Sequence, residues 1–144
     1  MALFTQDTKV KSLRQTPLFE GLSKRELTEL ARRSEDMELE PGTVLCKEGD
    51  VGKEFFVIVD GEVDVKRKGR RLGTRGPGDF IGEIALLEDI ERTATVTAKT
   101  PLRVFVLTRP ALQHLINESP AVERKVMRTL ARRLAAMSKD PALS

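Results

Sequence analysis

The spacing of glycines constrains the fold of this chain more than any other feature. Nine of its ten glycines fall between Gly42 and Gly82, where they alternate with short runs rich in β-branched or aromatic residues. Those runs read TVLCK, EFFVIVD, EVDVKRK and RLGTR. Turn residues at such intervals between brief apolar segments are typical of antiparallel sheets. The middle of the chain is therefore predicted to form a barrel or jelly roll.

Two of these runs indicate how individual strands are buried. In GEVDVK, Val63 and Val65 alternate with charged residues, which is the period of a strand with one solvated face. The run FFVIV is apolar at odd and even positions alike, so it is predicted to be a central strand covered on both faces.

Helical patterns flank the strands. Ser23 and Glu26 have the spacing of a capping box ahead of KRELTELARRS. After the strands, RPALQHLINE leads into Ser119 and Pro120, a suitable N-cap and first helical residue. The helix that follows is predicted to carry an apolar stripe made of Val122, Val126, Leu130, Leu134 and Met137. The predicted order is helix, sheet, helix, with frayed termini.

Composition excludes several classes of protein. A chain of 144 residues with 40% hydrophobic and 33% charged residues suits one soluble domain. No apolar run is long enough to cross a membrane, and the start MALFTQDTKVKSL does not resemble a secretory signal, so we expect a cytoplasmic protein without a membrane partner. The 25 basic and 22 acidic residues nearly balance, which does not favour nucleic-acid binding.

Nothing in the sequence points to catalysis. The single cysteine, Cys46, lies in an apolar run and is expected to be a buried structural thiol. The single histidine, His114, lies in a helical pattern, where a surface position is expected. Without a histidine cluster, an activated cysteine or a recognisable acid pair, we expect neither a catalytic residue nor a metal site, and no enzyme.

A candidate anion site begins at Gly82. The residues after it, EIALL, are good helix formers, and the first turn of a helix offers free amide donors to an anion. Arg92 begins the run RTATVTA, so it is predicted to stand at the mouth of a strand, where its fork suits phosphate. An ion pair between Arg92 and Glu83, Glu88 or Glu91 explains the arginine equally well.

The segment from Gly78 to Leu87, followed by Arg92 to Val96, resembles the phosphate-binding cassette of the cyclic nucleotide-binding domain family. Upstream, GDVGKEFFVIVDGEVDV resembles the glycine-bounded hairpin of that family, and the last helices resemble its B and C helices. The resemblance implies a mainly β fold, an antiparallel jelly roll with N-terminal helices and C-terminal B and C helices.

It also implies a division of the chain. Residues 1–17 would form a partly helical N-terminal segment, residues 18–138 the cyclic nucleotide-binding domain, and residues 139–144 a frayed tail. Within the domain, the barrel would span about residues 37–108, the B helix about 109–118 and the C helix about 120–138.

The resemblance assigns a role to each candidate residue. Glu83 would accept a hydrogen bond from the ribose 2′-hydroxyl, and Arg92 would bind the exocyclic oxygens of the cyclic phosphate. The amides of Gly82, Ile84 and Ala85 would donate to the same anion. Thr93 and Ala94 follow the arginine in the cassette, and Ser138 matches a C-helix serine that contacts adenine in one branch of the family.

One departure from the family pattern lies beside the arginine. Glu91 occupies a position where the family often has proline, which puts another negative charge next to the phosphate. Thr93 does not decide the base, because relatives with serine or threonine there take either cyclic GMP or cyclic AMP.

The expected function is therefore a regulatory sensor without a cofactor. It would bind cyclic AMP in preference to cyclic GMP and transmit occupancy through the C helix, with a homodimer through that helix and an effector protein or missing output domain as partners. The alternative is a jelly-roll module that has lost the nucleotide and binds proteins, with Arg92 paired to Glu83 or Glu91.

Overall fold

The computed structural model of the chain describes residues 6–82 and 91–137. Its helices are α1 (Gln6–Arg14), the short 3₁₀ helix η1 (Pro17–Phe19), α2 (Lys24–Arg32), α3 (Arg109–Glu118) and α4 (Pro120–Met137). Its strands are β1 (Glu35–Leu39), β2 (Val44–Cys46), β3 (Glu54–Asp60), β4 (Val63–Arg67), β5 (Arg70–Arg75), β6 (Phe80–Ile81), β7 (Thr95–Ala98) and β8 (Leu102–Thr108). The predicted frayed tail, residues 139–144, and residues 1–5 of the predicted frayed start lie outside the described residues, whereas Gln6 and Asp7 of that start belong to α1.

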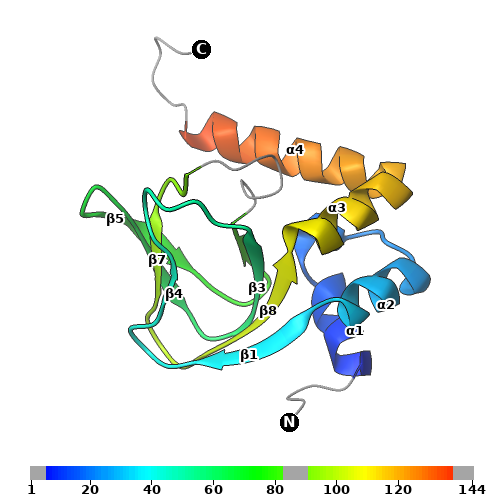
Figure 1. Cartoon of the computed structure of the whole chain (residues 1–144), viewed down its shortest axis with the longest axis horizontal. Coiled ribbons are helices and arrows are strands. Elements are labelled where there is room, and N and C mark those ends of the chain that lie inside the picture. Colours follow the sequence, from blue (N-terminus) through cyan, green and yellow to red (C-terminus); the bar gives the residue numbers. More distant parts are fainter. Residues whose placement is uncertain (1–5, 83–90, 138–144) are drawn as a thin grey trace.

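The strands form two antiparallel four-stranded sheets that pack face to face. One sheet has the order β1-β8-β3-β6 and the other the order β2-β7-β4-β5. Figure 1 shows the helices gathered on one side of this sandwich, with α1, α2 and α3 against the first sheet. The prediction of a mainly β jelly roll with helices before and after it is confirmed.

Strand β3 occupies the centre of its sheet, between β8 and β6, as the run FFVIV predicted. Phe56 and Ile58 face the space between the two sheets, whereas Phe55 and Val57 face the helices. Because its two faces contact two different cores, the strand needs apolar residues at every position. The other sheet follows the simpler pattern, since Val63 of β4 is fully buried while Lys66 is exposed.

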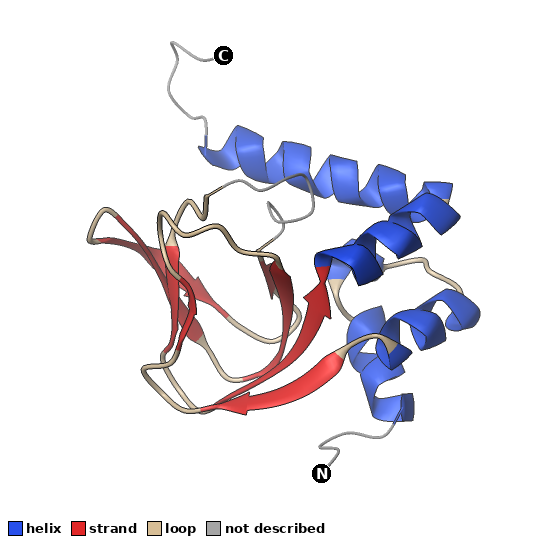
Figure 2. Ribbon diagram, viewed as in Figure 1, coloured by secondary structure: helices blue, strands red, loops and turns tan. Residues whose placement is uncertain are grey.

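The capping box before α2 is confirmed. Ser23 Oγ accepts from the amide of Glu26 at 3.1 Å, and Glu26 Oε1 accepts from the amide of Ser23 at 3.0 Å. This fixes the start of a helix that buries Leu27, Leu30 and Ala31 against the sheet. Figure 2 shows the resulting arrangement, with the helices on one side and the strands on the other.

Helix α4 packs against α3 and η1 and runs from them toward the strands, along the top of Figure 1. Val122 and Val126 are buried in the helix-facing core, and Leu130 is half-buried against it. The hydroxyl of Ser119 accepts from the amide of Val122 at 3.4 Å, next to Pro120 at the first helical position. The side chains of Leu134 and Met137 lie outside the described part of the structure.

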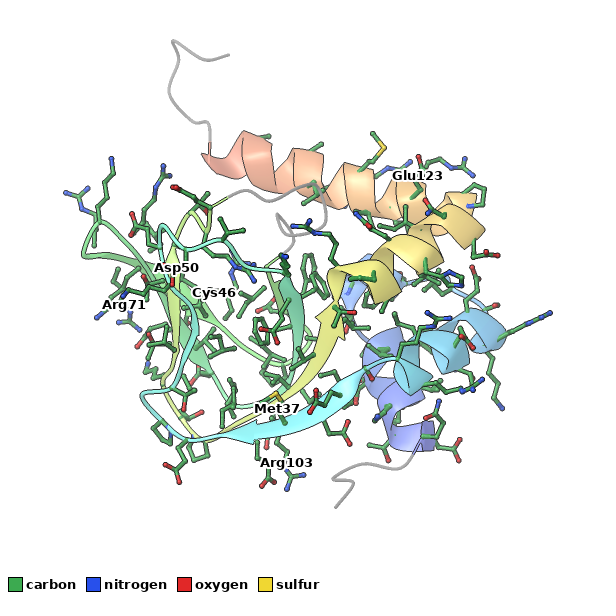
Figure 3. The ribbon with its side chains drawn as sticks, viewed as in Figure 1. Met37, Cys46, Asp50, Arg71, Arg103 and Glu123 are labelled. Atoms are coloured by element: carbon green, nitrogen blue, oxygen red, sulfur yellow. The ribbon has the colours of Figure 1, made fainter. Side chains whose placement is uncertain are left out.

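The expectations for two single residues are confirmed, because Cys46 is buried and His114 is exposed. Figure 3 shows Cys46 inside the sandwich, whereas Arg71 and Arg103 lie on its outer rim. Each of these arginines is held there by an acid at 2.9 Å, Arg71 by Asp64 and Arg103 by Glu38. Among the helices of residues 6–82 and 91–137, none has the length and apolar character needed to traverse a bilayer.

Candidate functional site

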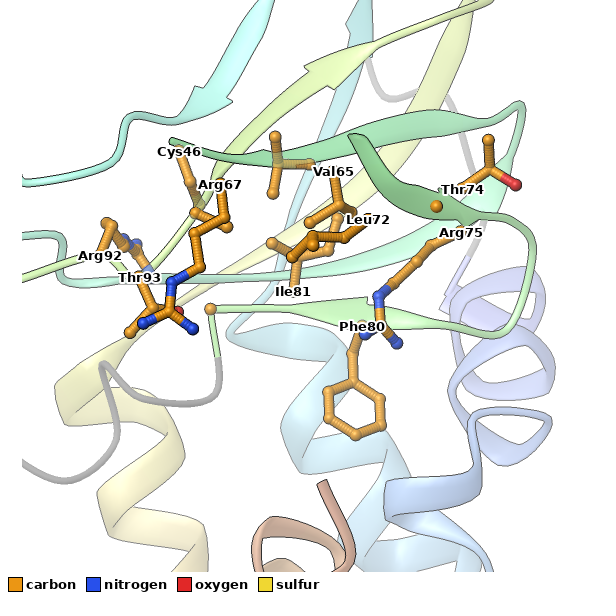
Figure 4. A pocket seen from close by; sticks show the side chains of 14 residues that line it. Cys46, Val65, Arg67, Leu72, Thr74, Arg75, Phe80, Ile81, Arg92 and Thr93 are labelled. Atoms are coloured by element: carbon orange, nitrogen blue, oxygen red, sulfur yellow. The ribbon is translucent and has the colours of Figure 1, made fainter. Parts of the chain in front are cut away.

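A cavity of about 210 Å³ opens between the two sheets, with walls from β4, β5, β6 and residues 92–96. Four of the predicted site residues, Gly82, Arg92, Thr93 and Ala94, line it together. The other four, Glu83, Ile84, Ala85 and Ser138, lie outside the described residues. The described part of the predicted site is thus collected in one place (Figure 4).

Arg92 is the central side chain of this pocket. It is only 8% exposed, and its Nη2 donates to the carbonyl oxygen of Glu54 at 2.8 Å. Its Nη1 is buried without a hydrogen-bond partner among the described residues. A buried donor of a charged group left unpaired costs about 1–3 kcal/mol or more. Within the described part of the chain, the pocket therefore contains a buried cation with one terminal nitrogen that has no acceptor.

The backbone around Arg92 is fixed by the loop before β3. The amide of Arg92 donates to the carbonyl of Asp50 at 2.7 Å, and its own carbonyl accepts from the amide of Gly49 at 2.9 Å. Val51 and Glu91 form an isolated antiparallel bridge beside these bonds. As a consequence, β7 begins at Thr95. The run RTATVTA predicts a strand with Arg92 at its mouth, and the paired strand starts three residues after Arg92 because Arg92 pairs with the loop before β3 instead of with β4.

Two glycines make room for the guanidinium. A Cβ at Gly52 would lie 2.0 Å from Nε of Arg92, and a Cβ at Gly82 would lie 2.6 Å from its Nη1. Gly82 also has φ +90°, a conformation that costs glycine little. The prediction included Gly82 but missed Gly52. The only sequence signal for Gly52 is a glycine just ahead of a buried strand, which is common in turns of any function.

The pocket wall opposite Arg92 comes from the β4–β5 hairpin. Val65 and Leu72 give it an apolar surface, and Arg67 and Arg75 stand farther along the same strands (Figure 4). The alternation of strand residues places positions 65 and 67 on one face, and the same holds for 73 and 75. Neither arginine is predicted as a pocket residue from the sequence, because an alternating arginine on a strand usually faces solvent.

The turn of this hairpin is tied to the neighbouring strand. Lys68 has φ +52°, unusual for a residue with a side chain, and its amide donates to Glu48 Oε1 at 2.8 Å. The amide of Glu48 donates in turn to Thr95 Oγ1 at 3.0 Å. These bonds link the hairpin turn to the start of β7, so the two sides of the pocket are held in fixed relation.

The chemistry of the lining narrows the ligand class. Within the described residues, three arginines and no carboxylate line the cavity, and no group of three or more histidine, cysteine or acidic side chains could hold a metal ion. Apolar side chains fill most of the remaining wall. Such a pocket suits an anion attached to a flat apolar ring, and it offers no metal chemistry from these residues.

Comparison of the sequence with known proteins identifies a matching family and similar curated proteins. The sequence profile of the family "Cyclic nucleotide-binding domain" matches residues 36–119. A curated relative, the cAMP-dependent protein kinase regulatory subunit of Yarrowia lipolytica, is 39% identical over 106 residues, which are 72% of this chain and 28% of that protein. The chain thus spans less than a third of the length of this relative.

Solved structures are similar as well. The catabolite activator protein of Thermus thermophilus superposes with a TM-score of 0.77 at 30% identity, over 84% of this chain and 59% of that one. The regulatory domain of Toxoplasma gondii PKA, crystallised with cAMP, gives a TM-score of 0.71 at 30% identity, over 76% of this chain and 44% of that one.

Proposed function

Because the chain belongs to the cyclic nucleotide-binding domain family, we propose that its pocket binds a cyclic nucleotide, with cyclic AMP favoured over cyclic GMP. The domain then works as a regulatory sensor and not as an enzyme. Its ligand is the nucleotide alone, without a cofactor.

The observation that supports this most strongly is the state of Arg92. Its guanidinium is buried and oriented by one bond to Glu54, and its Nη1 has no partner among the described residues. A cyclic phosphate is a monoanion with two exocyclic oxygens, so it matches a single fixed cation. Charge-assisted bonds between arginine and phosphate are about twice as strong as bonds between neutral groups.

The remaining roles follow the cassette. The phosphate accepts hydrogen bonds from the backbone amides of Gly82, Ile84 and Ala85. Glu83 accepts a hydrogen bond from the ribose hydroxyl. The base lies beside Thr93 and Ala94. Ser138 contacts the base from the C helix. These assignments belong to a domain of residues 18–138, with residues 1–17 before it and residues 139–144 after it.

Cyclic AMP is favoured on the basis of two similar proteins: the Yarrowia lipolytica kinase subunit is called cAMP-dependent, and the Toxoplasma gondii domain was crystallised with cAMP. An efficiency of about −0.3 kcal/mol per atom for roughly 22 non-hydrogen atoms gives a dissociation constant on the order of 10 μM. Tighter binding requires a lid over the base.

Helix α4 is the element suited to such a lid and to signal output. It extends from the helical side of the molecule toward the strands (Figure 1). Among the described residues, its buried side chains are confined to its first half. A ligand that binds one position of α4 better than another shifts the population between the two. The output passes to a second copy of the chain, or to an effector protein or further domain, and the protein acts in the cytoplasm.

The test is thermal unfolding with and without cyclic AMP. At a concentration one hundred times the dissociation constant, the ligand should stabilise the wild type by about 2.7 kcal/mol. In Arg92→Ala this stabilisation should disappear, each variant being compared with its own unliganded state. Arg103→Ala, which removes an arginine from the outer rim, is the matched control and should keep the full shift. A wild type that neither cyclic AMP nor cyclic GMP stabilises would favour the ligand-free interaction module.

A further inference from the structure

Arg67 places a second cation in the pocket wall. It is the last residue of β4, and β4 pairs with β7 in a register that sets Lys66 opposite Thr95. This register brings Arg67 to the level of the residues just before β7, and both Arg67 and Thr93 line the cavity. Figure 4 shows the guanidinium of Arg67 directed toward the end where Arg92 and Thr93 lie, whereas Arg75 extends toward Phe80.

Arg67 is available to a ligand. It makes no ion pair or hydrogen bond with another described residue, in contrast to Arg71 of the same hairpin, which Asp64 holds at 2.9 Å. The phosphate does not require it, since Arg92 already supplies a buried donor beside Gly82. Arg67 lines the same cavity as Arg92, Val65 and Leu72, so a base joined to a phosphate at Arg92 would share this cavity with the Arg67 side chain.

The two purines present different groups to an arginine there. Guanine offers two acceptors side by side, N7 and O6, which match the fork of a guanidinium, whereas adenine offers N7 beside the N6 amino donor. We propose that Arg67 is a specificity-determining residue that donates to N7 and O6 of guanine. It thereby raises the affinity for cyclic GMP relative to cyclic AMP, and narrows the preference for cyclic AMP that the rest of the pocket sets. This rests on the proposed function of the pocket.

The test is calorimetric titration of the whole chain with each nucleotide. In Arg67→Met we expect the affinity for cyclic GMP to fall about 5- to 10-fold, the lower end of the range for a paired base contact because Arg67 is exposed, while cyclic AMP changes less than about twofold. Arg67→Gln should change the ratio of the two affinities further in favour of cyclic AMP. The glutamine amide can pair with N6 and N7 of adenine, so this variant should bind cyclic AMP more tightly than the wild type does.

Arg70→Met is the matched control. Arg70 is the cross-strand partner of Arg67 at the same turn and carries the same charge, but it does not line the cavity. Its substitution should leave the ratio of the two affinities unchanged. An equal loss for both nucleotides in Arg67→Met would make Arg67 a phosphate contact and overturn the proposal, as would an unchanged ratio in both Arg67 variants. A wild type that binds neither nucleotide would refute the proposed function itself. This result differs from both an equal loss of affinity and an unchanged ratio, which would overturn only the role of Arg67.

Discussion

Arg92 shows how the fold orients one buried guanidinium toward a pocket. One terminal nitrogen is held by the carbonyl of Glu54 at 2.8 Å, and the other is buried and unpaired among the described residues. Buried donors without partners are rare, because each loses its hydration without compensation. Among the described residues, Nη1 of Arg92 is therefore the buried donor that a phosphate oxygen could pair with.

A change at Gly52 tests whether the position of this fork matters. In Gly52→Ala the new methyl group would lie 2.0 Å from Nε and 2.4 Å from Cζ of Arg92, so the guanidinium must move. We expect affinity for cyclic AMP to fall at least about tenfold, or roughly 1.4 kcal/mol, by isothermal calorimetry. Gly76→Ala is the control, since its methyl group would meet only a carbonyl oxygen at 3.9 Å. Wild-type affinity in Gly52→Ala would show that the fork tolerates displacement.

At this scale the sequence predicted the residues within the cassette and missed those outside it. Gly82, Arg92, Thr93 and Ala94 belong to one local motif, and all four line the pocket. Gly52 reaches Arg92 only because the loop before β3 pairs with the chain before β7. Such a contact depends on the fold and has no local signature.

Among the secondary-structure elements, the start of α2 is connected through Glu26 to Ser119, the residue between α3 and α4. A hydrogen bond from the hydroxyl of Ser119 holds the pKa of Glu26 below its ordinary value, and the bond from the amide of Ser23 acts in the same direction. The carboxylate therefore links the first turn of α2 to the junction between α3 and α4. The ionised form is the one that makes both bonds.

This link predicts a pH-dependent stability. Because the folded state lowers the pKa of Glu26, its stabilisation is complete above the pKa of the unfolded chain and is lost as the pH falls through the lower folded pKa. Glu26→Ala should lower the free energy of unfolding by about 1 kcal/mol at pH 7, and by less as the solution is acidified through that folded pKa. Urea unfolding at several pH values measures this. Glu20→Ala, an exposed acid nearby, should show neither effect; a loss in Glu26→Ala that does not vary with pH would refute the ionic contribution.

The strands were predictable to different degrees. Glycine spacing identified the β region, and apolar residues at consecutive positions identified β3 as central. The division into two sheets was not predictable, because it depends on pairings such as β1 with β8, which join distant parts of the chain. The start of β7 at Thr95 was not predictable for the same reason, since Arg92 exchanges backbone hydrogen bonds with the loop before β3 and not with a strand.

For the whole molecule, the proposal requires α4 to contribute to ligand affinity. Its packed residues, Val122, Val126 and half-buried Leu130, lie in the part next to α3 and η1. Shortening the chain after Leu130 removes the rest of the helix while keeping these contacts. We expect the affinity for cyclic AMP to fall about tenfold, since the closed arrangement would lose its contacts with the base.

A chain that lacks only residues 140–144 is the control for this truncation and should bind like the full chain. Circular dichroism of both proteins checks that the sandwich is retained. Equal affinity in the two truncated chains and the full chain would exclude a lid formed by the second half of α4.

Whether Nη1 of Arg92 binds the cyclic phosphate can be seen in a crystal structure of the chain with cyclic AMP. We expect a distance of about 2.7–3.2 Å between this nitrogen and an exocyclic phosphate oxygen, with the bond to Glu54 retained. A nucleotide bound with its phosphate away from Arg92, or an Nη1 paired with a carboxylate while the ligand is present, would contradict it.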